Sequence, residues 1–381
     1  MSLPIVYTES SLRDALADVF GQLAPDKVLL VTGKDSFELS GAKQICKEVF
    51  RTIASKQFCD FSTNPKLEDL VKGIDIARNF SPDVIVAIGG GSVLDIAKSI
   101  SLLANVDQDI RSTVIGSSTL DSVSIIPTVA VPTTTGTGAE ATQFSVVYVD
   151  GIKYSLSHTC MRPQYVILDA VLTQSLSSYI TACAAFDALG QAIESMWSIQ
   201  SNPESCEYAR EAFSLLIPAL TKAVKGDLQA RHDLLLGAYK SGKAINISRT
   251  TASHALSYPL TAHHGLPHGH AVGLTLGKVL LFNSGVTKDD LNDPRGLEHV
   301  NSILREIYNF LGASSAIEAE KKLYTLMQDM GLSTNLSELG IKSQDELFVI
   351  AKEVSQERAK NNPRFFDETS ASSILSSLYK I

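Results

Sequence analysis

Residues 83–100 read DVIVAIGGGSVLDIAKSI and decide the fold of this chain. The run at 84–88 is apolar at every position, which is typical of a strand buried on both faces of a parallel sheet. Glycines at 89–91 permit a tight turn, and residues 92–104 have the apolar spacing of a helix. This order of strand, glycine turn and helix predicts one unit of an α/β domain.

The same alternation continues on both sides of this segment. Strands are expected at 27–32, 57–61, 125–131, 143–148 and 165–168, and helices at 40–53 and 66–80. Alternating strands and helices predict a Rossmann-like parallel sheet with right-handed crossovers. We expect this α/β domain to occupy residues 1–177.

The pattern changes after about residue 172, where strand signals become rare. Helices are expected at 180–198, 206–224, 230–248, 273–281, 296–311, 316–330, 343–352 and 371–378. The sequence therefore predicts a second, all-α domain at residues 178–381.

Composition excludes several classes of protein. A hydrophobic content of 44% over 381 residues is that of a globular chain and rules out disorder. The net charge of −8 argues against a nucleic-acid or polybasic membrane partner. Five scattered cysteines without a CxxC pair, and an N-terminus unlike a secretory signal, favour a reduced, cytoplasmic setting.

Two loops at expected strand ends suit a nucleotide. Gly89, Gly90, Gly91 and Ser92 precede a helix N-terminus, which attracts phosphate, although a glycine triplet alone is also a simple turn. Residues 131–142 read VPTTTGTGAEAT and offer many hydroxyl groups, including those of Thr133, Thr134, Thr137 and Thr142. Two such loops in one open α/β sheet favour a nucleotide cleft over solvated turns.

A second cluster of polar residues suits a divalent metal. Asp187 and Gln191 are four residues apart and share one helix face. Five of the eight histidines fall within residues 254–270, including His254 and His268. A carboxylate with two imidazoles can hold Fe²⁺ or Zn²⁺, and the clustering makes a purely structural role for these side chains less attractive.

These motifs resemble, in order and over essentially the whole chain, those of the iron-containing (group III) alcohol dehydrogenases. The matching segments are KVLLVTG, the NP turn at 64–65, GGGSVLDIAK, VPTTTGTGAEAT, DALGQAIES, HALSYPL, LPHG and the NPR segment at 362–364. The resemblance implies an N-terminal dinucleotide-binding domain, an all-helical C-terminal domain, and a metal and nicotinamide in the cleft between them.

The resemblance implies metal ligation by Asp187, His254 and His268. The family's fourth ligand is usually a histidine, where this chain has Gln191. Gln191 ligates through its oxygen, or three ligands and water suffice, or the metal is lost; we favour these in that order. The family's proton-carrying histidine is replaced by Tyr258, so His264 or His270 is a candidate for that role, and Tyr258 either relays the proton or only shapes the pocket.

For the cofactor, the resemblance adds Asn64 and Lys153 to the two loops as contacts. Members that prefer NAD often carry an aspartate after the first strand, and this chain has Gly33 followed by Lys34. Loss of the acidic group and gain of a cation favour NADP(H) over NAD(H).

The resemblance implies metal-assisted hydride transfer between an alcohol and an aldehyde or ketone. Polar side chains that the helical domain contributes, such as those of Arg249 and His263, favour a polar substrate: a sugar, a sugar acid or a phosphonate aldehyde. One branch of the family oxidises the C8 alcohol of 3-deoxy-manno-octulosonate for lipopolysaccharide assembly. The departures at Gln191 and Tyr258 are compatible with that branch, for which an oxidase description would replace that of a dehydrogenase.

The sequence leaves two other functional interpretations open. A dehydroquinate synthase-like lyase shares this fold, a bound nicotinamide and a metal. A non-catalytic relative would explain Gln191 and Tyr258, but the intact loops oppose it. The resemblance also implies a homodimer or larger homo-oligomer.

Overall fold

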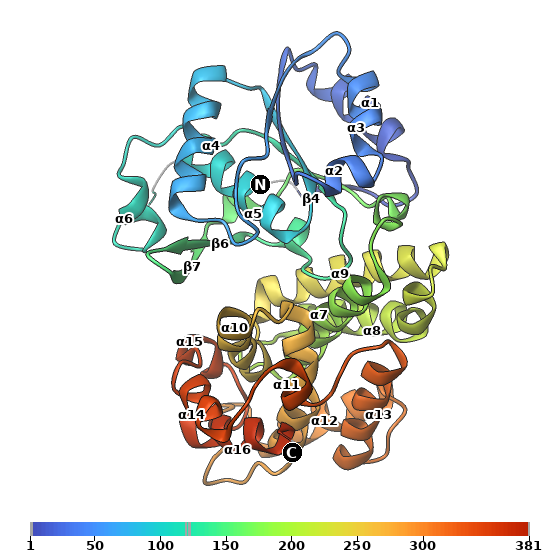
Figure 1. The fold of residues 1–381 in the computed structure, drawn as a ribbon, viewed down its shortest axis with the longest axis vertical. Helices are drawn as coiled ribbons and strands as arrows, with labels where there is room; N and C mark the ends of the chain where they lie inside the picture. Colours follow the sequence, from blue (N-terminus) through green and yellow to red (C-terminus); the bar gives the residue numbers. More distant parts are fainter. Residues whose placement is uncertain (1–2, 119, 121–122, 380–381) are drawn as a thin grey trace. The chain divides into compact units, whose positions relative to one another are not determined.

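The structure is a computed structural model that describes residues 3–118, 120 and 123–379 (Figure 1). The chain divides into two compact units, of which the first ends at Ser175 and the second begins at Leu176.

A six-stranded parallel sheet forms the centre of the first unit, in the order β1-β8-β5-β4-β2-β3. The strands are β1 (Ile5–Tyr7), β2 (Lys27–Thr32), β3 (Ala54–Phe58), β4 (Val84–Gly89), β5 (Thr128–Pro132) and β8 (Tyr165–Ile167). The chain leaves β2 toward β3 and then returns to β4 on the other side. The carboxyl ends of β2 and β4 therefore flank a topological switch point, where open α/β sheets bind ligands.

Helices cover both faces of this sheet. They are α1 (Leu12–Leu23), α2 (Ser36–Leu39), α3 (Ala42–Val49), α4 (Leu67–Phe80), α5 (Gly91–Leu103) and α6 (Ile110–Val114). Alternate residues of β2 face opposite cores: Leu29 and Val31 belong to the core shared with α4 and α5, and Val28 and Leu30 to the core shared with α1 and α3 (Figure 1). The expected strand at 84–88 is fully buried, and the predicted α/β fold is confirmed.

Three local expectations for the first unit need correction. The strand expected at 143–148 is β6 (Phe144–Val149), which pairs antiparallel with β7 (Ile152–Ser157) in a separate two-stranded sheet. Asp150 and Gly151, both with positive φ, form the turn between them, as Asp-Gly hairpins require. The strand β5 begins only at Thr128, after Pro127, and the strand expected at 57–61 is β3, at Ala54–Phe58. The edge strand β1 was not expected, because its three residues are too few to show a period.

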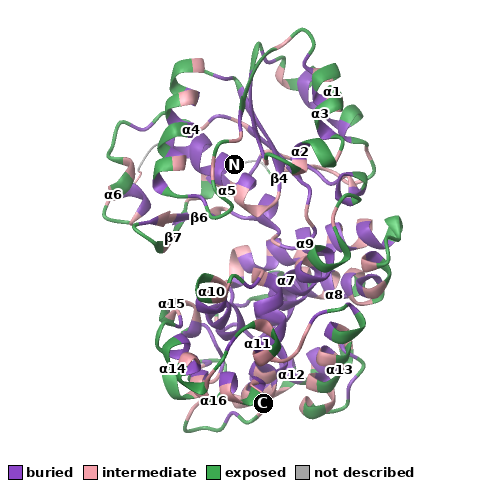
Figure 2. Ribbon diagram, in the orientation of Figure 1, coloured by how far each residue is buried: buried purple, intermediate pink, exposed green. Residues whose placement is uncertain are grey.

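The second unit is helical, as expected. Its helices are α7 (Ser178–Trp197), α8 (Pro203–Val224), α9 (Leu228–Ser248), α10 (Ala252–His264), α11 (His268–Ser284), α12 (Leu297–Phe310), α13 (Ala316–Asp329), α14 (Gln344–Lys352), α15 (Gln356–Ala359) and α16 (Glu368–Leu378). Helix α7 is buried over almost its whole length and contacts α8, α9 and α11 (Figure 2). Across the described ranges, we find no helix with the length and apolar character that a membrane crossing needs.

Helix α10 and the start of α11 were not expected from the sequence. Pro259 lies inside α10, Gly265 ends it with φ 65°, and Pro267 caps α11. Prolines and glycine usually interrupt a helical pattern. Here they produce a sharp turn between two helices, and the buried polar residues of these helices hide the apolar period.

Candidate metal and cofactor sites

Three polar residues share one face of the buried helix α7. Asp187, Gln191 and Glu194 follow at intervals of four and three residues, which places them on successive turns. None of them is more than 4% exposed. Burying carboxylates is costly unless hydrogen bonds or a cation compensate them, so this face requires polar partners.

Histidines at the beginnings of α10 and α11 supply two of these partners. His254 Nε2 lies 3.4 Å from Asp187 Oδ1, and His268 Nε2 lies 3.7 Å from the same oxygen. One donor atom from each residue falls within 4.8 Å of the others. The structure thus brings together Asp187, His254 and His268, three of the four residues predicted to hold a metal.

A glycine permits the close approach of α11 to α7. A Cβ atom at Gly269 would lie 1.9 Å from the carbonyl oxygen of Cys183 and 2.9 Å from the Cβ of Asp187. No side chain fits there, because real Cβ atoms essentially never approach backbone this closely. The backbone contact sets His268, the preceding residue, beside Asp187.

The second ring nitrogen of each histidine contacts a further polar residue. His254 Nδ1 bonds to the carboxylate of Glu194, which also accepts from Thr251 Oγ1 and the Ser253 N–H over 2.7 Å each. His268 Nδ1 lies 3.1 Å from Ser257 Oγ. Such partners fix the orientation of metal-binding imidazoles. Sequence reasoning missed Glu194, although its helical spacing from Asp187 was a usable signal.

The donor set fits a divalent cation. The buried Nε2 of His254 has no hydrogen-bond partner among the described residues. Burial disfavours a charged ring, but Glu194 and Asp187 outweigh this effect and raise the pKa of His254 to about 10. Two buried carboxylates therefore attract positive charge to this point, and one carboxylate with two imidazoles is a set that Fe²⁺ and Zn²⁺ accept.

Gln191 touches the same set. Its Nε2 donates to Asp187 Oδ1 over 3.2 Å, and its Oε1 accepts from Ser241 Oγ of α9 over 3.2 Å. In this arrangement the amide nitrogen, rather than the oxygen, faces the ligand cluster.

The three candidate catalytic residues differ in their surroundings. The ring of Tyr258 stacks on His268, with centroids 5.7 Å apart and planes at 10°. His264 is half-buried at the end of α10. His270 is buried: its Nε2 donates to Ser333 O over 2.8 Å, and its Nδ1 lies 3.1 Å from the Tyr179 hydroxyl. Burial lowers the pKa of His270, which favours the neutral form of the ring.

The two predicted cofactor loops pack against each other in the first unit. Thr133 N donates to Gly89 O over 2.9 Å, because β4 and β5 are neighbours. A Cβ atom at Gly91 would lie 2.8 Å from Thr137 Cγ2, and one at Gly90 3.3 Å from Thr134 Cγ2. The glycines therefore let the two loops pack closely. Helix α5 begins here, and the free N–H groups of a helix N-terminus suit a pyrophosphate.

Polar atoms within the second loop support this assignment. The hydroxyls of Thr133 and Thr135 are buried without a hydrogen-bond partner in the described part of the chain. Buried hydroxyls are normally bonded, so their presence indicates that a ligand or water completes this loop.

A buried lysine, which sequence reasoning missed, holds the second loop. The Lys98 ammonium donates to Ala139 O and Thr142 Oγ1 over 2.9 Å each and also to Phe144 O. It pairs with Asp95 at 3.2 Å. The hydroxyl of Thr142, predicted as a cofactor contact, is therefore engaged within the loop.

The remaining predicted cofactor residues lie at the margins of these loops. Ser92 Oγ donates to Thr63 O, which places the turn with Asn64 next to the glycine loop. Tyr148 N donates to Pro65 O over 2.8 Å, and Lys153 pairs with Tyr148 across the β6–β7 hairpin.

The residues after β2 lie at the switch point. Gly33 directly follows β2. Lys34 forms an ion pair with Asp60 at 3.3 Å, and both side chains are exposed. An exposed pair of this kind is weak, so the Lys34 ammonium is able to rearrange toward an anionic group.

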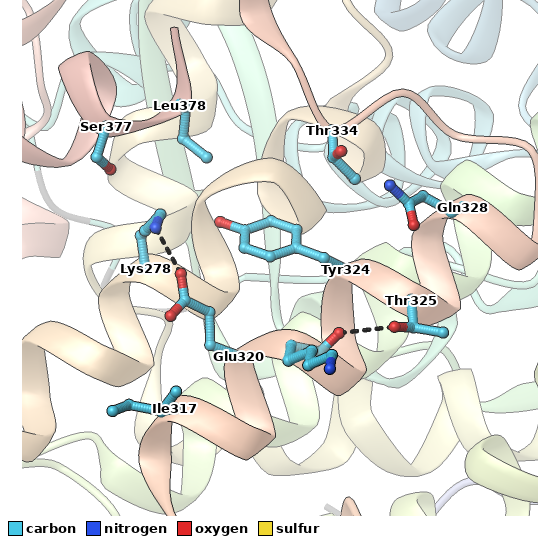
Figure 3. Close-up of a pocket in the computed structure, with 10 residues that line it drawn as sticks. Lys278, Ile317, Glu320, Tyr324, Thr325, Gln328, Thr334, Ser377 and Leu378 are labelled. Carbon is cyan, nitrogen blue, oxygen red and sulfur yellow. Dashed lines mark hydrogen bonds and ion pairs between the residues drawn. The ribbon is translucent and has the colours of Figure 1, made fainter. Parts of the chain in front are cut away.

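A pocket of about 380 Å³ in the second unit does not contain the ligand cluster (Figure 3). Its lining includes the ion pair of Lys278 with Glu320 at 2.6 Å, beside Tyr324, whose hydroxyl donates to Leu274 O. Because these polar groups already have partners, this pocket is a weaker candidate for the reactive site than the histidine cluster.

Comparison with known proteins gives matches over both units. The family model for "Iron-containing alcohol dehydrogenase" matches residues 4–170, and that for "Fe-containing alcohol dehydrogenase family, C-terminal" matches residues 181–379. The chain is 37% identical to a phosphonoacetaldehyde reductase of Streptomyces viridochromogenes, over 78% of this chain and 76% of that protein. It is 30% identical to long-chain-alcohol dehydrogenase 1 of Geobacillus thermodenitrificans, over 93% and 89%.

A solved structure shows the same fold. Sulfoacetaldehyde reductase from Bifidobacterium kashiwanohense, in complex with NAD⁺, superposes with a TM-score of 0.85 at 26% identity. The match covers 98% of this chain and 96% of that one.

Proposed function

Because the chain belongs to the iron-containing alcohol dehydrogenase family, we propose that it interconverts a small anionic aldehyde and its alcohol, with a divalent metal and NAD(P). Family membership makes it an oxidoreductase acting on CH–OH groups. The lyase and the non-catalytic reading are therefore not retained. The observation that carries the site assignment is the convergence of Asp187, His254 and His268.

The roles of the chain's own residues follow from this geometry. When bound, the metal supplies Lewis-acid polarisation of the substrate oxygen and the nicotinamide carries the hydride. Asp187, His254 and His268 hold the metal, and Glu194 keeps His254 Nε2 directed toward Asp187. The glycine loop (residues 89–92) binds the pyrophosphate, while Lys98 keeps the threonine loop (residues 131–142) in place.

We assign proton handling and pocket shape from the surroundings of the three candidates. Tyr258 covers the His268 ring and shapes the substrate side of the ligand cluster. His264 is the preferred proton carrier, because both ring nitrogens of His270 already have partners. His270 instead joins α11 to α7 and to the segment at Ser333.

An aldehyde with a phosphonate or sulfonate group is the preferred substrate. Relatives that reduce phosphonoacetaldehyde and sulfoacetaldehyde support this choice over a sugar acid such as 3-deoxy-manno-octulosonate. Of the polar residues noted in the sequence, His263 pairs with Glu353 at the surface, 2.6 Å away. The half-buried Arg249, with φ 61° at the end of α9, is our candidate for contact with the anion, since strained residues concentrate at ligand sites.

We propose NADP(H) as the preferred cofactor. Gly33 leaves no acidic group directly after β2, and the ion pair of Lys34 with Asp60 is exposed and therefore weak. A homodimer or larger assembly and a cytoplasmic location stay predictions.

The substrate is tested by steady-state kinetics of the metal-loaded protein. Phosphonoacetaldehyde, sulfoacetaldehyde and butanal are compared with NADPH and with NADH. We expect kcat/KM for an anionic aldehyde to exceed that for butanal by at least about tenfold. Arg249→Met should remove most of this preference and leave the rate with butanal unchanged. Equal or greater activity with butanal would instead place the protein with the alcohol dehydrogenases of uncharged substrates.

A further inference from the structure

The amide of Gln191 lies between Asp187 and Ser241. Its Nε2 is 3.2 Å from Asp187 Oδ1, and its Oε1 is 3.2 Å from Ser241 Oγ. Gln191 is 4% exposed and Ser241 is fully buried. In a site shielded from water, the neighbouring donors and acceptors decide which way an amide points.

Ser241 has one proton and two oxygen atoms within reach of it. Its Oγ lies 2.9 Å from Ala238 O and 3.2 Å from Gln191 Oε1. Both of these oxygens can only accept, and the hydroxyl has a single proton to share between them. When Ala238 O, at the shorter distance, takes the proton alone, the Ser241 oxygen is able to accept from the amide, and an acceptor favours Nε2 of Gln191 on that side.

The amide has a second orientation of the same shape. A half-turn about its last bond exchanges oxygen and nitrogen, so that Nε2 meets Ser241 Oγ and Oε1 meets Asp187 Oδ1. Without a cation this orientation places two acceptor oxygens together and is unfavourable. A divalent cation beside Asp187 attracts both oxygens, so the preferred orientation depends on the metal.

We propose that Gln191 turns its amide when the metal binds, and that its Oε1 then joins Asp187, His254 and His268 as a fourth donor. Ser241 is the positioning residue, because it accepts from Nε2 and holds this orientation. The inference rests on the proposed metal site and specifies which atoms would coordinate the metal there. Two oxygen and two imidazole donors form a harder set than one oxygen and three imidazoles, so this site discriminates less against Mn²⁺ relative to Zn²⁺.

The test measures metal affinity on the full chain, by competition with a chromophoric chelator for Zn²⁺ and Mn²⁺, together with the visible spectrum of bound Co²⁺. We expect Ser241→Ala to weaken Zn²⁺ binding about tenfold and to alter the Co²⁺ spectrum. Ser195→Ala is the matched control: Ser195 is also fully buried and donates to a carbonyl three residues earlier, at 3.0 Å. It should leave both readings unchanged.

Two further variants complete the test. In a Gln191→Leu background, Ser241→Ala should have no additional effect, because Ser241 acts only through the amide. Gln191→His should increase the preference for Zn²⁺ over Mn²⁺.

The outcomes separate this inference from the proposed function. A wild type that binds no metal overturns both. A wild type that binds one metal, with Gln191→Leu binding it equally tightly, or with Ser241→Ala matching Ser195→Ala, overturns the amide orientation alone and leaves a three-ligand site.

Discussion

Two buried ionisable side chains, those of Lys98 and Glu140, shape the threonine loop. The Lys98 side chain is fully buried and anchors three oxygens from residues 139–144. Glu140 lies in the same loop and is 2% exposed. Burial raises the pKa of Glu140 to about 7, although the Lys98 ammonium opposes the shift. The loop is thus held by one buried cation and carries a carboxyl that resists ionisation.

This raised pKa predicts a pH-dependent stability. A carboxyl with a raised folded-state pKa favours folding below its unfolded value, near 4.5, and this contribution is lost as the pH rises through about 7. The glutamine of Glu140→Gln cannot ionise, so the variant does not lose this contribution as the pH rises. Between pH 4.5 and 8, the free energy of unfolding of the variant should therefore rise by roughly 3 kcal/mol relative to that of the wild type. Urea unfolding across this range measures the difference, with the exposed Glu68→Gln as control. A constant difference for Glu140→Gln would show that Glu140 ionises normally.

The sequence predicted those site residues that have a recognisable chemistry and spacing. The structure groups Asp187 with His254 and His268, and Gln191 contacts Asp187. The roles of these residues as ligands stay a prediction. Glu194, Ser241 and Lys98 were missed, because their importance depends on which helix or loop packs against them. A periodic pattern contains no such information.

Helix packing around α7 determines the geometry of the metal site. Asp187 and Gln191 come from α7 itself, whereas His254 and His268 come from the first turns of α10 and α11. Their distances therefore depend on how closely those helices approach α7. At Gly269 that approach is limited by backbone contact.

Substitution of Gly269 tests this dependence. In Gly269→Ala the added methyl group would overlap the carbonyl oxygen of Cys183, so α11 must move away and carry His268 from Asp187. We expect a loss of metal affinity of at least about tenfold and a destabilisation of roughly 1–3 kcal/mol. Equilibrium dialysis and thermal unfolding measure the two effects. In Gly21→Ala, where no atom lies within 4 Å of the new Cβ, neither property should fall.

Elements were predictable where local pattern and tertiary context agree. The all-apolar run of β4 and the glycines after it predicted strand, turn and helix correctly. The hairpin partner β7 was missed because its residues are largely exposed, although the Asp150–Gly151 turn signalled it. Helix α10 was missed because Pro259 and its buried polar residues break the expected pattern.

At the scale of the whole molecule, the proposed chemistry divides between the two units. The first unit carries the glycine and threonine loops at the carboxyl ends of β4 and β5. The second unit carries the histidine cluster around α7. Family models match each unit separately, at residues 4–170 and 181–379. In the proposed function, the first unit binds the cofactor and the second binds the metal.

The most direct test of this account is the metal content of the purified protein after anaerobic loading with Fe²⁺ or Zn²⁺ and removal of excess metal. We predict about one metal ion per chain in the wild type and in the control Asp329→Ala, which changes an exposed residue. Asp187→Ala should retain almost none and should lose alcohol–aldehyde interconversion. A wild type without metal under either loading, or an Asp187→Ala variant that keeps a full equivalent, would contradict the assignment of the histidine cluster as the metal site.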